Sequence, residues 1–463
     1  MEKYFKLKEN NTTVKTEVIA GITTFVTMAY IIFVNPSILR MAGMNAAGAL
    51  GDGALPFNAF NDPVVGSVMA ATCISAAIGT LIMGLYANYP FAQAPGMGLN
   101  AFFAFSVVLG MSYTWQQALA AVFISGLVFI LITLTKIREM IIDSIPMSLK
   151  HAVSGGIGLF IALIGLKNAG IIVANPATLV GFGDLTAPAT LLAIFGLMLT
   201  AILMSRNIKG SMLLGILATT LVGIFTGVVA IPEGFSLVSA PPSLSHTFMK
   251  MDFAGLLKVG EGATLATAIT GILTVILSFS FVDMFDTIGT LVGTASKANM
   301  MDKDGKLPRV NKALMADAIA TSAGAMLGTS TVTTYVESAA GVLEGGRTGL
   351  TSVVTSALFI LALFFAPLVG LVPAEATAPA LIIVGVLMMG ALKEIDFNDF
   401  TVAFPAFLTV VMMPFTYSIA NGIASGMIAY PIVKVATGKH KEVHPVVYIL
   451  AALFILRFAT MAG

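Results

Sequence analysis

The sequence of 463 residues is 57% hydrophobic and 10% charged, and its formal net charge is +1. Soluble domains carry about 25% charged residues, so this composition excludes a soluble globular protein, and the lack of a basic tract gives no indication of a nucleic-acid partner. The single cysteine, Cys73, excludes an intrachain disulfide, and four scattered histidines without metal-ligand spacing give no reason to expect a metal or another cofactor.

Apolar runs of about 20 residues recur along the chain, and each is long enough to cross a bilayer as a helix. In the first half we expect spans near residues 17–36, 64–87, 95–111, 114–135, 148–168, 187–205 and 211–230. A polar stretch, 231–262, divides the chain, and the second half runs over 263–463. Within it, 398–437 can form a broken hairpin, and 446–461 can be a final span or a helix on the membrane surface. The sequence predicts an all-α polytopic protein embedded in the lipid bilayer.

The basic residues predict the orientation of the spans. Of the 24 Lys and Arg residues, all but Arg40, Lys167, Lys250, Lys258 and Arg457 fall on one set of connections, which includes the N-terminal segment. Cytoplasmic loops carry an excess of basic residues, so we expect a cytoplasmic N-terminus and a multi-pass protein of the cell membrane. The opening segment has no short apolar core with a cleavage site, so it is not a secretory signal peptide.

Two stretches of the first half recur in the second half in the same order. Residues 25–30 (FVTMAY) match 281–286 (FVDMFD), and 69–77 (MAATCISAA) match 315–323 (MADAIATSA). Seven spans per half is an odd number, so the second half must enter the membrane from the opposite side. This predicts inverted repeats, 1–230 and 263–463, with a central site between them as in secondary transporters.

Two segments at matching positions of the halves predict broken helices. Residues 91–100 contain Pro and Gly, which disfavour helix, and 328–337 are rich in Thr, Ser and Val, which favour extended backbone. Each continues into an apolar run too short for a complete span. Aligning the breaks places Asn100 opposite Glu337, each at the start of a half-helix whose N–H groups point into a buried cavity.

Four carboxylates lie inside apolar segments: Asp283, Asp286, Asp317 and Glu337. A charged side chain at the bilayer centre costs at least ~2.5–3.5 kcal/mol on insertion scales, so such residues mark functional sites. Asp283 and Asp286 are spaced i, i+3 and share one helix face. Asp317 is explained equally well by a pairing with a donor at a span end, so we expect it to be a neighbour of the site and not a ligand.

At these residues the chain resembles the hypoxanthine/guanine/adenine permease branch of the nucleobase transporter superfamily. The matching stretches include TEVIAGITTFVTMAYIIFVNP, APGMGLNAFFAF, SFVDMFDTIGTLVG, TSTVTTYVESAAGV and MMPFTYSIANGI. The resemblance implies fourteen spans, with a core domain (spans 1–4 and 8–11) that carries substrate past a gate domain (spans 5–7 and 12–14) by an elevator-type movement. It implies that short extended segments in spans 3 and 10 meet at the site, and it suggests a homodimer through the gate domain.

The resemblance also implies site residues. Carried over by motif position, the purine-binding residues fall on Asn100, Asp283, Asp286 and Glu337. To these we add Thr334 in the extended run and Thr27, which with Tyr30 occupies the repeat-equivalent places of Asp283 and Asp286. A hydroxyl bonded back to its own helix turn explains Thr27 and Tyr30 as well.

Purines are flat and neutral, with donors and acceptors around the ring edge, so a dry site must pair those groups. We expect Glu337 to be the principal ring-edge contact and Asp283 the second. An ionised Asp283 accepts but does not donate hydrogen bonds, which favours guanine or hypoxanthine and leaves adenine as a further candidate. Uphill uptake of a neutral solute requires an ion gradient, and crowded carboxylates can hold a proton, so Asp286 or Glu337 is expected to carry one.

Two other functions compete with a proton-coupled purine symporter. An anion carrier of the related inverted-repeat fold is disfavoured because this site collects acids. An intramembrane hydrolase would need two carboxylates facing each other across one water, whereas Asp283 and Asp286 share a helix face. We therefore do not expect an enzyme.

Overall fold

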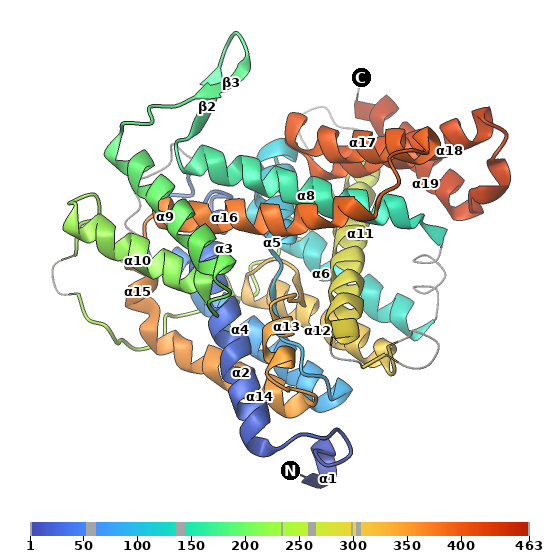
Figure 1. Cartoon of the computed structure of the whole chain (residues 1–463). Helices are drawn as coiled ribbons and strands as arrows, with labels where there is room; N and C mark the ends of the chain where they lie inside the picture. Colours follow the sequence, from blue (N-terminus) through green and yellow to red (C-terminus); the bar gives the residue numbers. More distant parts are fainter. Residues whose placement is uncertain are drawn as a thin grey trace.

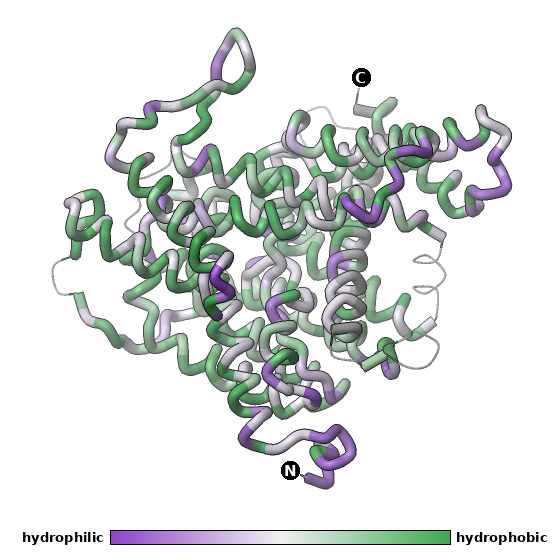
Figure 2. Tube along the Cα trace, in the orientation of Figure 1, coloured by the Kyte–Doolittle hydropathy of each residue, from purple (hydrophilic) through white to green (hydrophobic). Residues whose placement is uncertain are grey.

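The structure, a computed structural model, describes residues 2–51, 62–135, 144–232, 235–257, 265–297, 300–301 and 307–461. Helices make up most of the described chain (Figure 1). Hydrophobic residues run along nearly all of these helices, and hydrophilic residues gather in the N-terminal segment and in connections (Figure 2).

Eight helical stretches among the described residues are long and apolar enough to cross a membrane. They are Val14–Leu39, Pro63–Ala87, Trp115–Leu134, Met147–Asn168, Pro188–Ser205, Gly349–Leu371, Ala374–Glu394 and Ile419–Ala436. Shorter apolar helices are Met97–Gly110, Ser211–Phe225, Gly271–Met284, Phe400–Phe415 and Pro445–Leu456. A helical membrane-type protein is therefore confirmed, whereas the count of fourteen spans stays a prediction.

The helices pack mainly in two groups. The first group contains α2 (Val14–Met28), α3 (Ile31–Leu39), α4 (Pro63–Ile82), α6 (Trp115–Leu134), α12 (Val310–Leu327), α13 (Ser338–Leu343) and α14 (Gly349–Ala362). The second contains α8 (Met147–Asn168), α9 (Pro188–Ser205), α10 (Ser211–Phe225), α16 (Ala374–Met389), α17 (Phe400–Phe415), α18 (Ile419–Ala436) and α19 (Pro445–Met461). The long helix α11 (Leu265–Lys297) contacts members of both groups. In Figure 1, α2, α4 and α14 lie toward the N-terminal end, away from α17 and α18.

A buried carboxylate joins α2 to the start of α14. Glu17, in the first turn of α2, has no exposed surface. It accepts hydrogen bonds from the backbone N–H groups of Arg347 (2.9 Å), Thr348 (3.3 Å) and Thr351 (3.2 Å), and from the Thr351 hydroxyl (2.6 Å). The first N–H groups of a helix have no partner within it, so Glu17 satisfies the start of α14 and fixes the two helices together.

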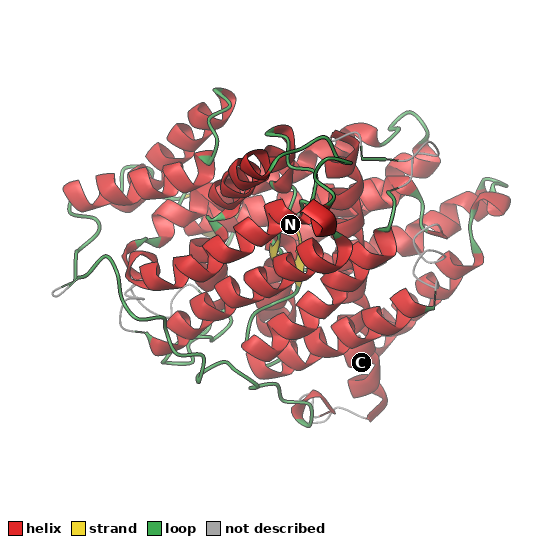
Figure 3. Cartoon of the chain, turned by 90° about the horizontal axis from the view of Figure 1, so that it is seen from below, coloured by secondary structure: helices red, strands yellow, loops and turns green. Residues whose placement is uncertain are grey.

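Two short strands from opposite halves of the chain pair inside the first group (Figure 3). Strand β1 (Gln93–Pro95) runs antiparallel to β4 (Val332–Thr334), with Gln93 opposite Thr334 and Pro95 opposite Val332. All six strand residues are buried. Extended backbone in a membrane interior needs hydrogen-bond partners within the protein, and each strand supplies them for the other.

Each strand leads directly into a helix. After β1 come α5 (Met97–Ala101) and the π-helical segment η4 (Phe102–Gly110), and after β4 comes α13. The extended stretches 91–100 and 328–337 that the sequence predicts therefore meet in the structure. A second hairpin, β2 (Ile172–Asn175) with β3 (Leu179–Phe182), projects from the helices as a largely exposed loop (Figure 1).

The region expected as a broken hairpin at 398–437 forms two separate packed helices, α17 and α18. Pro405 and Pro414 lie inside α17 without ending it. The final stretch forms α19, and its apolar part, Pro445–Leu456, is shorter than a full span.

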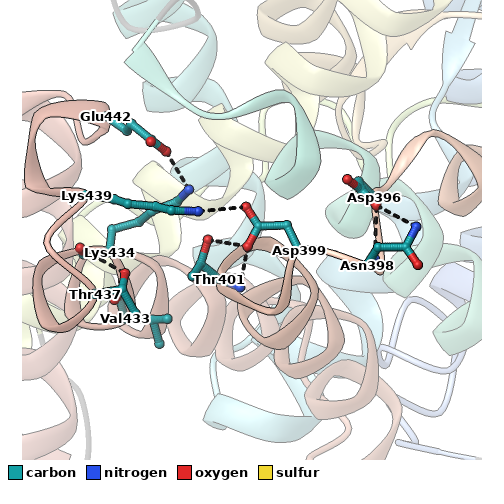
Figure 4. A network of polar contacts seen from close by, with 9 residues as sticks. All are labelled: Asp396, Asn398, Asp399, Thr401, Val433, Lys434, Thr437, Lys439 and Glu442. Carbon is teal, nitrogen blue, oxygen red and sulfur yellow. Dashed lines mark hydrogen bonds and ion pairs between the residues drawn. The ribbon is translucent and has the colours of Figure 1, made fainter.

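Polar residues join the start of α17 to the end of α18 (Figure 4). Asp399 accepts from the Thr401 backbone N–H (2.9 Å) and hydroxyl (2.7 Å) and from Lys439 Nζ (3.1 Å). These hydrogen bonds hold the pKa of Asp399 down, at about 2. The buried Lys434 donates to Glu442 (2.6 Å). Asp399 therefore ties the start of α17 to the segment that follows α18.

Candidate functional site

The paired strands form the centre of the candidate site. The two halves are also joined beyond the strands: Tyr335 donates its N–H to the Ala92 carbonyl (2.9 Å) and its hydroxyl to the Pro95 carbonyl (2.5 Å). The Ser338 hydroxyl accepts from the Ala92 N–H (2.9 Å). These contacts hold the start of each short helix in a fixed place relative to the other half.

Asp286 on α11 faces the start of α5. The Gly96 N–H donates to the Thr331 carbonyl (3.0 Å). A Cβ atom at Gly96 would lie 2.5 Å from Thr333 Cγ2 and 3.6 Å from Asp286 Oδ2. Glycine is therefore required by the close approach of β4, and the Asp286 carboxylate lies just beyond that backbone. Asp283, on the same helix, is completely buried.

Glu337 directly precedes α13 and meets the break between α2 and α3. The hydroxyl of Tyr30, which is 1% exposed, donates to Glu337 Oε1 at 2.6 Å. The Glu337 and Asp286 carboxylates are close enough for their charges to interact. The structure thus gathers an acid from α11, an acid before α13 and a tyrosine from the first half.

Thr27 lies beside this contact, but its hydroxyl bonds mainly to its own helix. It donates to the carbonyls of Thr24 (2.8 Å) and Thr23 (3.0 Å), and it lies 3.5 Å from the Glu337 carbonyl oxygen. The alternative of a hydroxyl bonded back to the helix turn therefore describes Thr27 in this structure.

Asn100 does not contact Glu337 through any interaction between described residues. Its Oδ1 accepts from the Ser330 hydroxyl, and its Nδ2 lies 3.5 Å from the Pro95 carbonyl. Asn100 is completely buried. The structure thus pairs Asn100 with Ser330, two positions before β4, and not with Glu337, which follows β4. The reason is that β1 and β4 run antiparallel, which brings the segment before β4 to the start of α5.

Asp317 lies behind the paired strands. Its Oδ1 accepts from the Thr287 hydroxyl (2.8 Å) and from Gln93 Nε2 (3.4 Å). Thr287 also shares a hydrogen bond with Thr333 (2.6 Å), and Gln93 Nε2 lies 3.4 Å from the Thr334 hydroxyl. Asp317 is completely buried. It therefore braces both strands and α11, and Thr334 takes part in the same brace.

The sequence did not predict that four residues would take part in the candidate site. These residues are Gln93, Tyr30, Ser330 and Tyr335. Tyr30 was noticed only as a repeat equivalent of Asp286. The available signal for the other three was a polar side chain inside a predicted break, which does not identify its partner.

The buried arrangement is rich in hydrogen-bonding groups. It offers carboxylate oxygens that accept, an amide and hydroxyls that do both, and surrounding apolar helices that exclude water. Within the residues that the structure describes, no group of three His, Cys, Asp or Glu side chains could hold a metal ion. A small apolar cavity lies elsewhere, between α8, α17, α18 and α19, and is lined by residues such as Leu149, Ile423 and Phe454.

Comparisons with known proteins identify the family of this chain. The model of the Permease family matches residues 15–425. The guanine/hypoxanthine permease PbuG of Bacillus subtilis is 48% identical over 99% of this chain and 99% of its own length. The adenine permease AdeP of Escherichia coli is 46% identical over 99% of this chain and 95% of its own length.

Solved structures show a similar fold. The transmembrane domain of the cyanobacterial bicarbonate transporter BicA superposes with a TM-score of 0.60, covering 90% of this chain and 97% of that domain at 15% identity. At this identity the likeness concerns the fold alone.

Proposed function

The chain belongs to the nucleobase permease family and is a transporter, not an enzyme, and from this premise we propose that it takes up purine nucleobases together with protons across the cytoplasmic membrane. One observation carries the proposal. Asp286 lies beside Gly96 at the start of α5, Glu337 follows β4 and accepts from Tyr30 of the first half, and the two carboxylates are close enough for their charges to interact.

Substrate recognition is proposed to use the carboxylates and the amide around the strands. Glu337 and Asp283 accept hydrogen bonds from ring N–H or amino groups, and Asn100 supplies its amide from the other half. Thr27 and Thr334 complete the lining, although both hydroxyls already have partners in this structure. Pairing the ring edge matters because an unpaired polar group in a dry site costs ~1–3 kcal/mol.

Proton coupling is proposed to use Asp286 or Glu337. Two carboxylates in one water-poor site repel each other when both are ionised, so one holds a proton readily. The approach of Asp286 to Glu337 supports a single shared proton-exchange unit. Binding the nucleobase and the proton in one place would couple their movements.

Transport is proposed to follow an elevator movement of the first helix group past the second. In this proposal the first group is the core domain (spans 1–4 and 8–11), and the second group is the gate domain (spans 5–7 and 12–14). The candidate site lies on elements of the first group, on α11, and on the strands and α5 that pack beside them, which supports carriage of the site as a unit. We further propose the two inverted repeats, 1–230 and 263–463, a cytoplasmic N-terminus and a homodimer through the gate domain.

The preferred purine is proposed to be guanine or hypoxanthine, because Asp283 is best suited to accept from N1–H. Adenine remains a candidate, since the guanine/hypoxanthine and adenine permeases are almost equally similar to this chain. An anion carrier is disfavoured because the site gathers acids, and the fold likeness to a bicarbonate transporter does not extend to sequence.

The test is uptake of radiolabelled hypoxanthine, guanine and adenine by cells that produce the protein and lack their own purine carriers. We expect accumulation of at least one purine, faster at acidic external pH and abolished by a protonophore. Correctly inserted protein that moves none of the three would overturn the proposal. Uptake that ignores the proton gradient would overturn only the coupling.

A further inference from the structure

Tyr30 makes a contact that its own helices do not need. It stands between α2 and α3, and its side chain caps neither helix. Its hydroxyl instead crosses to the second half of the chain and donates to Glu337 Oε1 at 2.6 Å. With 1% of its surface exposed, the ring is held firmly by its surroundings.

The chemistry of this pair suits a carboxyl group that gains and loses a proton. A hydroxyl can donate and accept, whereas an ionised carboxylate can only accept. Tyr30 therefore donates a charge-assisted bond when Glu337 is ionised. When Glu337 is protonated, its own O–H can donate to the Tyr30 oxygen. The contact can persist in both states, and the neutral phenol, unlike a lysine or arginine, adds no positive charge that would favour the ionised form of Glu337.

The internal repeat provides a second, independent observation. Tyr30 ends the stretch FVTMAY, and Asp286 ends the matching stretch FVDMFD. Both residues lie close enough to Glu337 for electrostatic interaction. Glu337 therefore interacts with two repeat-equivalent positions, one occupied by an acid and the other by a phenol. Glu337 thus has one partner that can carry a charge, Asp286, and one that only orients its carboxyl group, Tyr30.

The geometry points to Tyr30 as a positioning residue that holds the Glu337 carboxyl group by Oε1 and so presents Oε2 to the nucleobase. This inference rests on the proposed function of Glu337 as the principal purine contact. Tyr30 itself is not assigned a contact with the nucleobase. Its effect on transport passes through the orientation of Glu337.

The experiment measures uptake kinetics of Tyr30→Phe, which keeps the ring and removes the hydroxyl. A hydrogen bond to a charged group is worth about tenfold or more in binding, so we expect KM to rise roughly tenfold. We expect Vmax per inserted carrier to stay within about threefold. A role in folding alone would instead lower Vmax through fewer carriers at unchanged KM, and that result would overturn the inference. Tyr113→Phe, which removes the hydroxyl of another buried tyrosine outside the site, should leave KM unchanged.

A second variant keeps the test decisive if Tyr30→Phe inserts poorly. Glu337→Asp retains the charge but withdraws it from Tyr30 by one methylene, so it should raise KM as well. Glu337→Asp already breaks the hydrogen bond to the Tyr30 hydroxyl. The double variant Tyr30→Phe/Glu337→Asp should therefore have the same KM as Glu337→Asp alone. Effects that multiply would overturn the inference. If the wild-type protein itself transports no purine, the proposed function fails; if it does and Tyr30→Phe has normal KM, only the present inference fails.

Discussion

Gln93 of β1 lies directly opposite Thr334 of β4, although the two residues are 241 positions apart in the chain. This register places the start of α5 and the start of α13 on either side of a short sheet. The proposed ligands on or directly beyond the strands, Thr334, Asn100 and Glu337, depend on it, because a slip of one residue would turn each strand side chain to the opposite face.

Glu337→Gln should abolish or severely weaken purine binding. The amide keeps the shape of the side chain but replaces a charged acceptor with a neutral one and introduces a donor, which meets ring N–H groups unfavourably. We expect the Kd, measured with radiolabelled purine on purified protein, to rise by roughly 10- to 100-fold. Glu394→Gln, at an exposed position between α16 and α17, serves as the matched control. Near-normal affinity in Glu337→Gln would remove Glu337 from the binding site.

Asp286→Asn should retain binding but lose proton-driven accumulation. The amide preserves the packing of the side chain against Gly96, where a Cβ atom would lie 3.6 Å from Asp286 Oδ2, but it cannot exchange a proton. Counterflow of labelled for unlabelled purine should continue, while uptake against a concentration gradient stops. The control is Asp184→Asn in an exposed loop. A variant at Asp286 that still concentrates purine shows that the proton is carried elsewhere.

Gly96→Ala should inactivate transport. The added methyl would meet Thr333 Cγ2 at 2.5 Å, which forces β1 and β4 apart, and such overpacking typically costs about 1–3 kcal/mol. We expect at least a tenfold loss of uptake per inserted carrier. Gly293→Ala on α11 is the control, because a Cβ there meets no atom within 4 Å. Normal transport by Gly96→Ala would show that the strands do not need this close approach.

We expect Asp317 to stabilise the folded protein and not to bind the purine. Asp317→Ala removes a shared acceptor and leaves Thr287 and Gln93 only their hydrogen bonds to Thr333 and Thr334, and a lost hydrogen bond to a charged group costs about 1.5–3 kcal/mol. We expect a clear loss of thermal stability in detergent, whereas Asp317→Asn, which keeps an acceptor oxygen, should lose much less. Purine affinity of the folded Asp317→Asn protein should be close to normal. A large rise in Kd without loss of stability would make Asp317 a ligand.

The broken helices and the membrane-type helices could be predicted from local composition. The Pro and Gly residues before Asn100 and the Thr-rich run before Glu337 each indicate a break without knowledge of the rest of the chain. Apolar length likewise predicts membrane-type helices. Composition does not determine the register of two strands from distant segments. The partner of Asn100, Ser330, could therefore not be predicted by aligning the two halves.

Single buried polar residues were hard to interpret for the same reason. Glu17 reads in sequence as an ordinary charge at the start of a helix, yet it holds the first turn of α14. Repeat alignment selected the position of Tyr30 but not its bond to Glu337. Both contacts join segments about 300 or more residues apart, and only tertiary packing decides them.

Lys209 and Glu344 form an ion pair between the two helix groups. Lys209 lies between α9 and α10, and Glu344 directly follows α13, so an elevator movement must separate them. We expect the double variant Lys209→Cys/Glu344→Cys, made in a Cys73→Ala background, to lose uptake when a short bifunctional reagent or an oxidant joins the two cysteines. Reductant should restore uptake after oxidation, and each single variant should transport with or without oxidant. Exposed ion pairs contribute little to stability, so the single substitutions should not unfold the protein. Full transport by completely cross-linked protein would show that these groups keep their relative positions, and it would exclude the elevator movement at this contact.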